Sequence, residues 1–298
     1  MNRGKAMQKK QLEEQITAKI IEQMETAGAN WTRPFNTIDG TPQNIITGEV
    51  YKGGNYLLAI MLADCHLLGT YKQWKSIGAN VRKGEKGLHM FKYGTYEKDD
   101  PSAKDGKSQG QYFNSFCVFT ANQVDNLPDW VINTVETKPD LTTAVKNADE
   151  FVKNTKAVIK NGQPCYIPSQ DIIQMPLRNA FKDTESSSAT SHYYSTLFHE
   201  LTHWTGNAKR LDRKSHKRFA DPTYAFEELI AEMGAAFLCN RLGIDTSPRE
   251  DHAKYLNNWL QALKNKNDTS LILDAAKFAQ KAVDHVLELQ PQKLEEVA

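Results

Sequence analysis

The stretch HELTH at residues 199–203 determines how the second half of this chain can be organised. Its two histidines, His199 and His203, stand one helical turn apart and therefore point the same way, whereas Glu200 lies about 100° round the helix. Two imidazoles in this arrangement can hold a metal ion, and the glutamate between them can act as a general base. The motif predicts a metal-binding helix and, if the site is catalytic, peptide-bond hydrolysis.

The residues around the motif indicate a helix that displays its histidines to a neighbouring element. An apolar stripe on the opposite face would dock the helix into a core, and Gly206 would end it. The stripe consists of Tyr194, Leu197, Leu201 and Trp204.

A catalytic zinc normally has three protein ligands and one open position, so a third ligand must come from elsewhere. The longer motif HExxHxxGxxH fits as far as Gly206, but its last position holds Lys209, whose protonated amine cannot bind a cation. The other route is a carboxylate from a following helix, and the stretch FEELIAEMGAAFL at 226–238 offers it. Glu228 and Glu232 lie one turn apart in a stripe of small residues on a helix that is nearly apolar all round.

The position of each glutamate on this second helix predicts its role. Carboxylates among apolar residues are costly unless a cation pairs with them, and a metal with its histidines is a natural partner. We expect Glu228 to be the third metal ligand and Glu232 to orient a ligating histidine through its free ring nitrogen. Glu227 points towards Gly234 and Arg241, so we expect a solvated surface charge. The alternative is that all three glutamates form only an acidic helix face near its N-terminus.

Length and composition favour two domains without a membrane segment. The 298 residues include Lys+Arg 37 and Asp+Glu 36, a net charge of +1. A chain so near neutrality predicts that any DNA site is a local patch. The longest apolar stretch, 56–63, is far shorter than the roughly 20 residues of a membrane span. The N-terminus has no apolar segment behind its basic residues, and the four scattered cysteines form no CxxC pair, so we expect a cytoplasmic protein with reduced thiols.

Hydrophobic periodicity predicts an α+β fold, with a small mixed N-terminal domain and a mainly helical C-terminal domain. Turn signals near 128 and 139 divide the chain into a domain at 1–128, a linker at 129–140 and a domain at 141–298. One helix at 222–242 has signals at both ends: Asp221 as N-cap, Pro222 first and Gly243 just past the end. Other helical patterns cover 8–24, 56–66, 142–159, 177–181, 256–263 and 271–289, and strand patterns cover 88–96, 112–121 and 163–167.

A strip of positive charge interleaved with aromatic side chains lies in the N-terminal half. Between residues 71 and 92 six cations meet a single acidic residue, Glu85. Cations bind phosphates and aromatic faces stack on unpaired bases, so this strip is a candidate site for single-stranded DNA. The alternative is an ordinary charged surface whose aromatic residues serve a core. The cations are Lys72, Lys75, Arg82, Lys83, Lys86 and Lys92; Tyr71 and Trp74 lie among them, and Trp31, Tyr51 and Asn55 precede them.

Taken in order, the motifs resemble those of the ArdC-type antirestriction proteins of conjugative plasmids and phages, over nearly the whole chain. The stretch Gly53-Gly54-Asn55 departs from the family pattern, in which we expect an apolar residue before the asparagine. In the N-terminal half the resemblance rests on WTRPF at 31–35, Asn44, Thr47-Gly48, Tyr51, Gly54-Asn55, Trp74 with Gly78, and VRKGEK at 81–86. In the C-terminal half it rests on YIP at 166–168, Asp171, Met175-Pro176, the stretch 194–206, Arg210-Leu211 and AFEEL at 225–229.

The resemblance implies a single-stranded DNA-binding N-terminal domain and a zincin-like metallopeptidase domain, which protect incoming plasmid or phage DNA from host restriction. It implies DNA contacts around Trp31, Tyr51, Asn55, Trp74 and 82–86, and the basic residues could also contact duplex DNA. We expect a Zn2+ site, with another divalent metal as the alternative. The rival hypothesis is a DNA-shielding protein whose metal only braces the fold, and a third is a zinc peptidase that binds no DNA.

Overall fold

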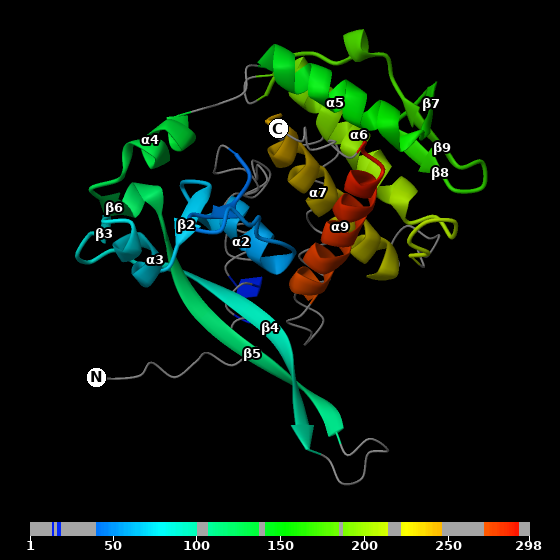
Figure 1. Cartoon of the computed structure of the whole chain (residues 1–298). Helices are drawn as coiled ribbons and strands as arrows, with labels where there is room; N and C mark the ends of the chain where they lie inside the picture. The colour runs from blue at the N-terminus through cyan, green and yellow to red at the C-terminus, as the bar shows by residue number, and fades with distance from the viewer. Residues whose placement is uncertain are drawn as a thin grey trace.

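The computed structural model describes residues 14, 17, 18, 40–99, 107–136, 141–184, 187–213, 222–245 and 271–291. The fold is α+β, as predicted, with N-terminal strands beside a group of helices from the second half (Figure 1). Three positions of the predicted helix at 8–24 are described and helical; its remainder, Trp31, Asp221 and the predicted helix at 256–263 lie outside the described residues. Within the described ranges, no helix combines the length and the apolar character needed to cross a bilayer.

A four-stranded sheet organises the N-terminal half. Its strands run in the order β1 (Gln43–Asn44), β2 (Leu67–Gly69), β5 (Lys107–Thr120) and β4 (Leu88–Asp99). β4 and β5 pair antiparallel along their length, and Figure 1 shows them as a ribbon that extends away from the helices. The strands predicted at 88–96 and 112–121 are confirmed and continue further towards the connection between them. A second, two-stranded sheet pairs β3 (Asn80–Val81) with β6 (Val124–Asp125).

A small hydrophobic core holds these strands to α3 (Tyr71–Ser76) and α4 (Asp129–Glu136). Trp74 is fully buried there, and its indole N–H donates to the carbonyl of Phe119 at 3.0 Å. Val131 of α4 is buried in the same core, and Val135, one helical turn later, packs against it because the two residues share one face of the helix. The segment expected as a linker at 129–140 therefore begins with a helix that packs on the N-terminal strands.

α2 (Gly54–Leu62) connects the two halves of the chain. It packs against α7 (Pro222–Leu242) and α9 (Leu271–Glu288), and all three helices contribute to one large core. The Tyr56 hydroxyl donates to Asn240 Oδ1 at 2.6 Å, and the Tyr56 ring lies 4.6 Å from the ring of Phe237. α2 ends before the predicted 66 because the chain turns into β2. The N-terminal half is thus packed on helices of the C-terminal half.

The C-terminal half places helices beside a three-stranded sheet. After α5 (Leu141–Thr155), the sheet runs in the order β7 (Val158–Asn161), β9 (Ile172–Met175) and β8 (Cys165–Ile167). α6 (Ala189–Thr205) packs against this sheet and against α7 and α9. The helix predicted at 142–159 ends early because Lys156 adopts φ 58° and turns the chain into β7. The helix predicted at 177–181 is a single 3-10 turn, Arg178–Ala180.

The predicted boundaries of α7 are confirmed. Pro222 occupies its first position, where the missing N–H costs nothing. Gly243 follows its last residue with φ 69°, a left-handed conformation that favours glycine after a helix.

Gly234 lets α6 and α7 approach closely. A Cβ at this position would lie 2.5 Å from Thr202 Oγ1 and 2.6 Å from its Cγ2. Thr202 is itself buried, and its hydroxyl donates to the Phe198 carbonyl at 2.7 Å, so the side chain has little freedom to move aside. The spacing of the two helices therefore depends on a glycine at this point.

We expect Gly234→Ala to lower the free energy of unfolding by about 1–3 kcal/mol, the usual cost of overpacking a core, although alanine is the better helix former. Urea denaturation measures the change. Thr202→Ala removes the two atoms that the new methyl group would approach most closely, so the double variant should recover most of the loss. If Gly234→Ala alone is as stable as the wild type, the contact with Thr202 does not limit the helix spacing.

Candidate metal centre

α6 presents both motif histidines from a helix that is embedded in the core. Ser188 caps the helix, since its hydroxyl accepts a hydrogen bond from the Ser191 N–H at 3.1 Å. Every member of the predicted apolar stripe is buried, which fixes the rotation of the helix and turns the histidines towards α7. These residues are Tyr194, Leu197, Leu201 and Trp204.

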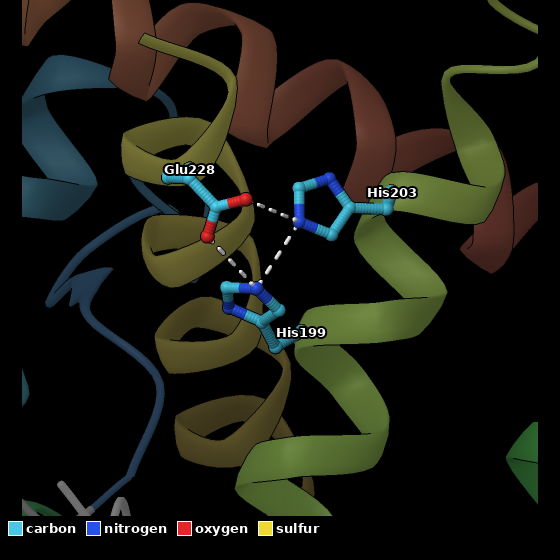
Figure 2. A group of neighbouring side chains, drawn as sticks. All are labelled: His199, His203 and Glu228. Carbon is cyan, nitrogen blue, oxygen red and sulfur yellow. Dashed lines mark hydrogen bonds and ion pairs between the residues drawn. The ribbon is translucent and has the colours of Figure 1, made fainter. Parts of the chain in front are cut away.

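α7 places Glu228 opposite the two histidines. Glu228 Oε2 lies 3.5 Å from His199 Nε2, and Oε1 lies 3.4 Å from His203 Nε2. The two Nε2 atoms are 3.1 Å apart. Figure 2 shows both rings and the carboxylate turned towards one point between the helices. One ligand atom from each side chain lies within 4.8 Å of the other two, as ligands of a common ion must.

The outer nitrogens of the two rings show why the donor atoms of this centre fit a metal ion. Glu232 Oε1 lies 3.1 Å from His199 Nδ1, and Glu227 Oε1 lies 3.2 Å from His203 Nδ1. A carboxylate attracts a ring proton, so both contacts favour hydrogen on Nδ1 and a lone pair on Nε2. Two nitrogen lone pairs and the Glu228 carboxylate then face one another, which is unfavourable unless a positive ion lies between them. The donor set therefore fits a divalent metal.

The prediction for Glu227 as a solvated surface charge is wrong. Glu227 is 8% exposed, and besides His203 it meets Arg213, whose Nη2 donates to Glu227 Oε1 at 2.8 Å. Arg213 arrives from the segment after α6. A partner supplied by another segment leaves no trace in the periodicity of α7.

Opposite charges keep the carboxylates of Glu227 and Glu228 ionised. Burial by itself would lower the pKa of His203, but Glu227 and Glu228 outweigh it and raise that pKa to about 10. Burial would raise the pKa of Glu228, yet His199 and His203 hold it well below its usual range. The pKa of Glu227 is lowered in the same manner by His203 and Arg213. A bound metal would replace the ring proton as the cation that balances Glu228.

Glu200 belongs to the same helix as the two histidines but is not one of the three meeting side chains. It is 4% exposed and follows His199 along α6. Burial, together with the negative charge of Glu200, raises the pKa of the Cys165 thiol in β8. The carboxylate therefore lies near the edge of the sheet, on a different side of α6 from Glu228, as the helical spacing predicts.

Several residues predicted to bind DNA make contacts within the framework. Trp74 is fully buried, which corrects the expectation that its ring stacks on a base. Asn55 bonds twice to the backbone of Phe91, donating to the carbonyl at 2.7 Å and accepting from the N–H at 3.1 Å. The Tyr51 hydroxyl, half-buried, lies 3.5 Å from Asn44 Nδ2. An aromatic side chain in a cationic strip can face the solvent or the core, and the local sequence pattern does not distinguish these two orientations.

The cations of the strip are exposed. Arg82 is held by ion pairs to Glu85 at 2.9 Å and Asp125 at 3.5 Å, so part of its charge is already compensated. Tyr71 is 54% exposed in α3 and has the accessible ring that Trp74 lacks. The exposed lysines are Lys72, Lys75, Lys83, Lys86 and Lys92.

Known families and solved structures match both halves of the chain. Residues 146–278 match the zincin-like metallopeptidase family, and residues 10–122 match the N-terminal domain of the anti-restriction factor ArdC. The antirestriction ArdC protein of plasmid R388 is similar in its metal-free form, with 36% identity and a TM-score of 0.73. Its Mn(II)-bound form gives 36% identity and a TM-score of 0.71. Each comparison covers 93% of this chain and 97% of the other.

Relatives known by sequence include proteins of similar and of much greater length. An uncharacterized protein, y4eC, of Sinorhizobium fredii is 32% identical over 91% of this chain and 90% of its own. Two Escherichia coli proteins named DNA primase TraC are 33% and 34% identical over 97% of this chain. The match covers 20% and 28% of those primases, so this chain spans about a quarter of their length.

We expect Glu228→Ala to weaken metal binding by more than about 100-fold, because loss of an outer partner alone typically costs about 10–100-fold. Mass spectrometry of the metal per chain after dialysis measures the loss. Glu200→Gln is the matched control, since it alters a buried glutamate of the same centre that is not one of the three meeting side chains. Equal metal content in the two variants would exclude Glu228 as a specific ligand.

Proposed function

This chain belongs to the ArdC family of antirestriction proteins, and from that premise we propose that it is a zinc metallopeptidase held on single-stranded DNA. In this proposal it protects incoming plasmid or phage DNA from host restriction in the bacterial cytoplasm. The observation that carries the proposal is the meeting of His199, His203 and Glu228 at one point, with a buried Glu200 next to His199 along α6.

We assign His199, His203 and Glu228 as the metal ligands. Two imidazoles and one carboxylate form a common ligand set of catalytic zinc, which keeps a further position open. The Mn(II) bound by the R388 relative supports a divalent ion in the family without identifying the ion used here. Glu232 holds the ring of His199 by its contact at Nδ1, and this contact keeps the Nε2 lone pair turned towards the ion.

We assign Glu200 as the proton carrier of peptide hydrolysis. The metal, when bound, supplies Lewis-acid polarisation of a peptide carbonyl and of a water molecule. Glu200 accepts a proton from that water at its carboxylate and later delivers the proton to the leaving amine nitrogen. Its burial next to His199 along α6 suits this role, because a buried carboxylate outside the proposed ligand set does not compete for the ion.

We assign the DNA contacts to the exposed side of the cationic strip. Lys72 and Lys75 of α3 flank Tyr71, and this combination offers phosphate contacts around one accessible ring. Lys83 and Lys86 extend the charge beyond β3, which packs against α3. Tyr71 replaces Trp74 as the candidate stacking residue, whereas Tyr51 and Asn55 act by shaping the framework beneath.

A second candidate function is DNA shielding by a protein whose metal only braces the fold. The burial of the centre favours it, since His199 is 1% and Glu228 6% exposed, as expected of a closed structural site. In that case protection comes from occupancy of the DNA, and Glu200 has no chemical task.

Glu200→Gln separates the two functions. We expect it to reduce proteolysis by about 10²–10⁴-fold, the usual contribution of a general acid–base group, while metal content and DNA affinity stay unchanged. Cleavage would be measured on casein and on a panel of DNA-bound proteins, with and without single-stranded DNA. Measurable wild-type cleavage that the variant retains in full would remove the catalytic assignment. Wild-type protein that cleaves nothing, with restriction protection intact in the variant, would favour shielding.

Tyr71→Ala and Lys75→Ala test the DNA assignment. We expect Tyr71→Ala to weaken oligonucleotide binding by about 1–3 kcal/mol, the usual value of one stacked base, with little change in salt dependence. Lys75→Ala should instead reduce the slope of log affinity against log salt by about 0.7 per lost phosphate contact. Fluorescence anisotropy with a labelled single strand measures both. Lys160→Ala, an exposed lysine of β7 in the C-terminal half, is the control; an equal effect there would indicate nonspecific attraction.

A further inference from the structure

Glu227 occupies the space between a candidate metal ligand and a buried arginine. Its Oε1 atom lies 3.2 Å from His203 Nδ1. Arg213 holds both carboxylate oxygens, with Nη2 donating to Oε1 at 2.8 Å and Nε donating to Oε2 at 3.2 Å. A two-pronged guanidinium contact fixes the plane of a carboxylate as well as its position. The Glu227 oxygen that faces the His203 imidazole is therefore fixed by a hydrogen bond from Arg213.

Arg213 is itself fixed by the end of α6. Its side chain is 6% exposed. Nη1 donates to Thr205 Oγ1 at 2.7 Å, and Nη2 donates to the Thr202 carbonyl at 2.6 Å. Gly206 makes room for the group, since a Cβ there would lie 3.0 Å from Arg213 Nη2. The guanidinium thus joins the last turn of α6 to the first turns of α7 at the carboxylate of Glu227.

We propose that Arg213, acting through Glu227, positions His203 for metal binding and couples the segment after α6 to the metal centre. Both histidines then have a buried carboxylate behind them, Glu232 for His199 and Glu227 for His203, and the second carboxylate depends on a residue from outside the helix pair. Partners of this kind set the tautomer and orientation of a ligating imidazole. The inference rests on the proposed metal site.

Arg210 provides a matched comparison within the same segment. Its side chain is largely covered, with 11% exposed, and it too bonds to the end of α6, donating from Nε to the Trp204 carbonyl at 2.7 Å. Its guanidinium lies over the Trp204 ring at 3.8 Å and pairs with Asp171. Among the described residues it forms no hydrogen bond or ion pair with a side chain of the metal centre. Arg210 therefore shares the bracing role of Arg213 without the link to His203.

Metal affinity distinguishes positioning from bracing. Binding of Zn2+ would be measured by competition with a chromophoric chelator, and the visible absorption of Co2+ would report the ligand geometry. We expect Arg213→Met to weaken Zn2+ binding by about 10–100-fold and to alter the Co2+ spectrum. Arg210→Met should lower the unfolding temperature. Its effect on Zn2+ affinity should be less than about 3-fold, well below the loss of about 10–100-fold expected for a residue that positions a ligand. Equal losses of affinity in the two variants would overturn the proposal.

A double-variant cycle tests whether Arg213 acts through Glu227. If it does, Arg213→Met should cause no further loss of Zn2+ affinity once Glu227→Gln is present, since coupled residues are not additive. Additive losses would overturn the proposed route. Should Arg213→Met fail to fold by circular dichroism, Arg213→Lys replaces it, and wild-type affinity in a folded Arg213→Lys that lacks the two-pronged contact would overturn the proposal. Wild-type protein that binds no Zn2+ or Co2+ would instead overturn the metal site itself.

Discussion

Buried negative charge between α6 and α7 is the constraint on which the rest of this centre depends. Glu227, Glu228 and Glu232 stand on one helix in the core, and each unpaired carboxylate there would cost several kcal/mol. Two imidazoles and one guanidinium face these carboxylates, yet the nitrogen and oxygen atoms that meet in the middle offer lone pairs. A cation between these atoms, a ring proton or a metal ion, completes the balance. Under the proposed function, the folding of the helix pair and the binding of the metal are therefore linked.

The same constraint explains why the two helices must be held at a fixed spacing. A metal ion accepts its ligands within a few tenths of an ångström, and a shift of one helix would separate the histidines from Glu228. Gly234 permits the close contact with Thr202, and the buried stripe of α6 prevents rotation. Packing of the core fixes the spacing and rotation of the two helices. The buried charged groups between them explain why that spacing must be fixed.

Packing of α2 on α7 and α9 has a consequence for the proposed function. Tyr56 bonds to Asn240 on α7, the helix that also carries Glu228. The N-terminal strands and α3 are thus joined through packed elements to the helices of the metal centre. Under the proposed function, single-stranded DNA on the lysines of α3 would hold the centre within one packed body, unlike a peptidase on a flexible tether.

Local periodicity was sufficient to predict the two helices and the candidate ligands that they carry. The spacing of His199 and His203, the carboxylates one turn apart on α7, and the signals at Pro222 and Gly243 are properties of single helices, so sequence was sufficient to predict them. Only the tertiary structure decided that Trp74 and Glu227 are buried and that Arg213 forms hydrogen bonds to the Glu227 carboxylate. Whether a side chain is covered, and by which partner, depends on segments far apart in the chain, and no local pattern records their approach.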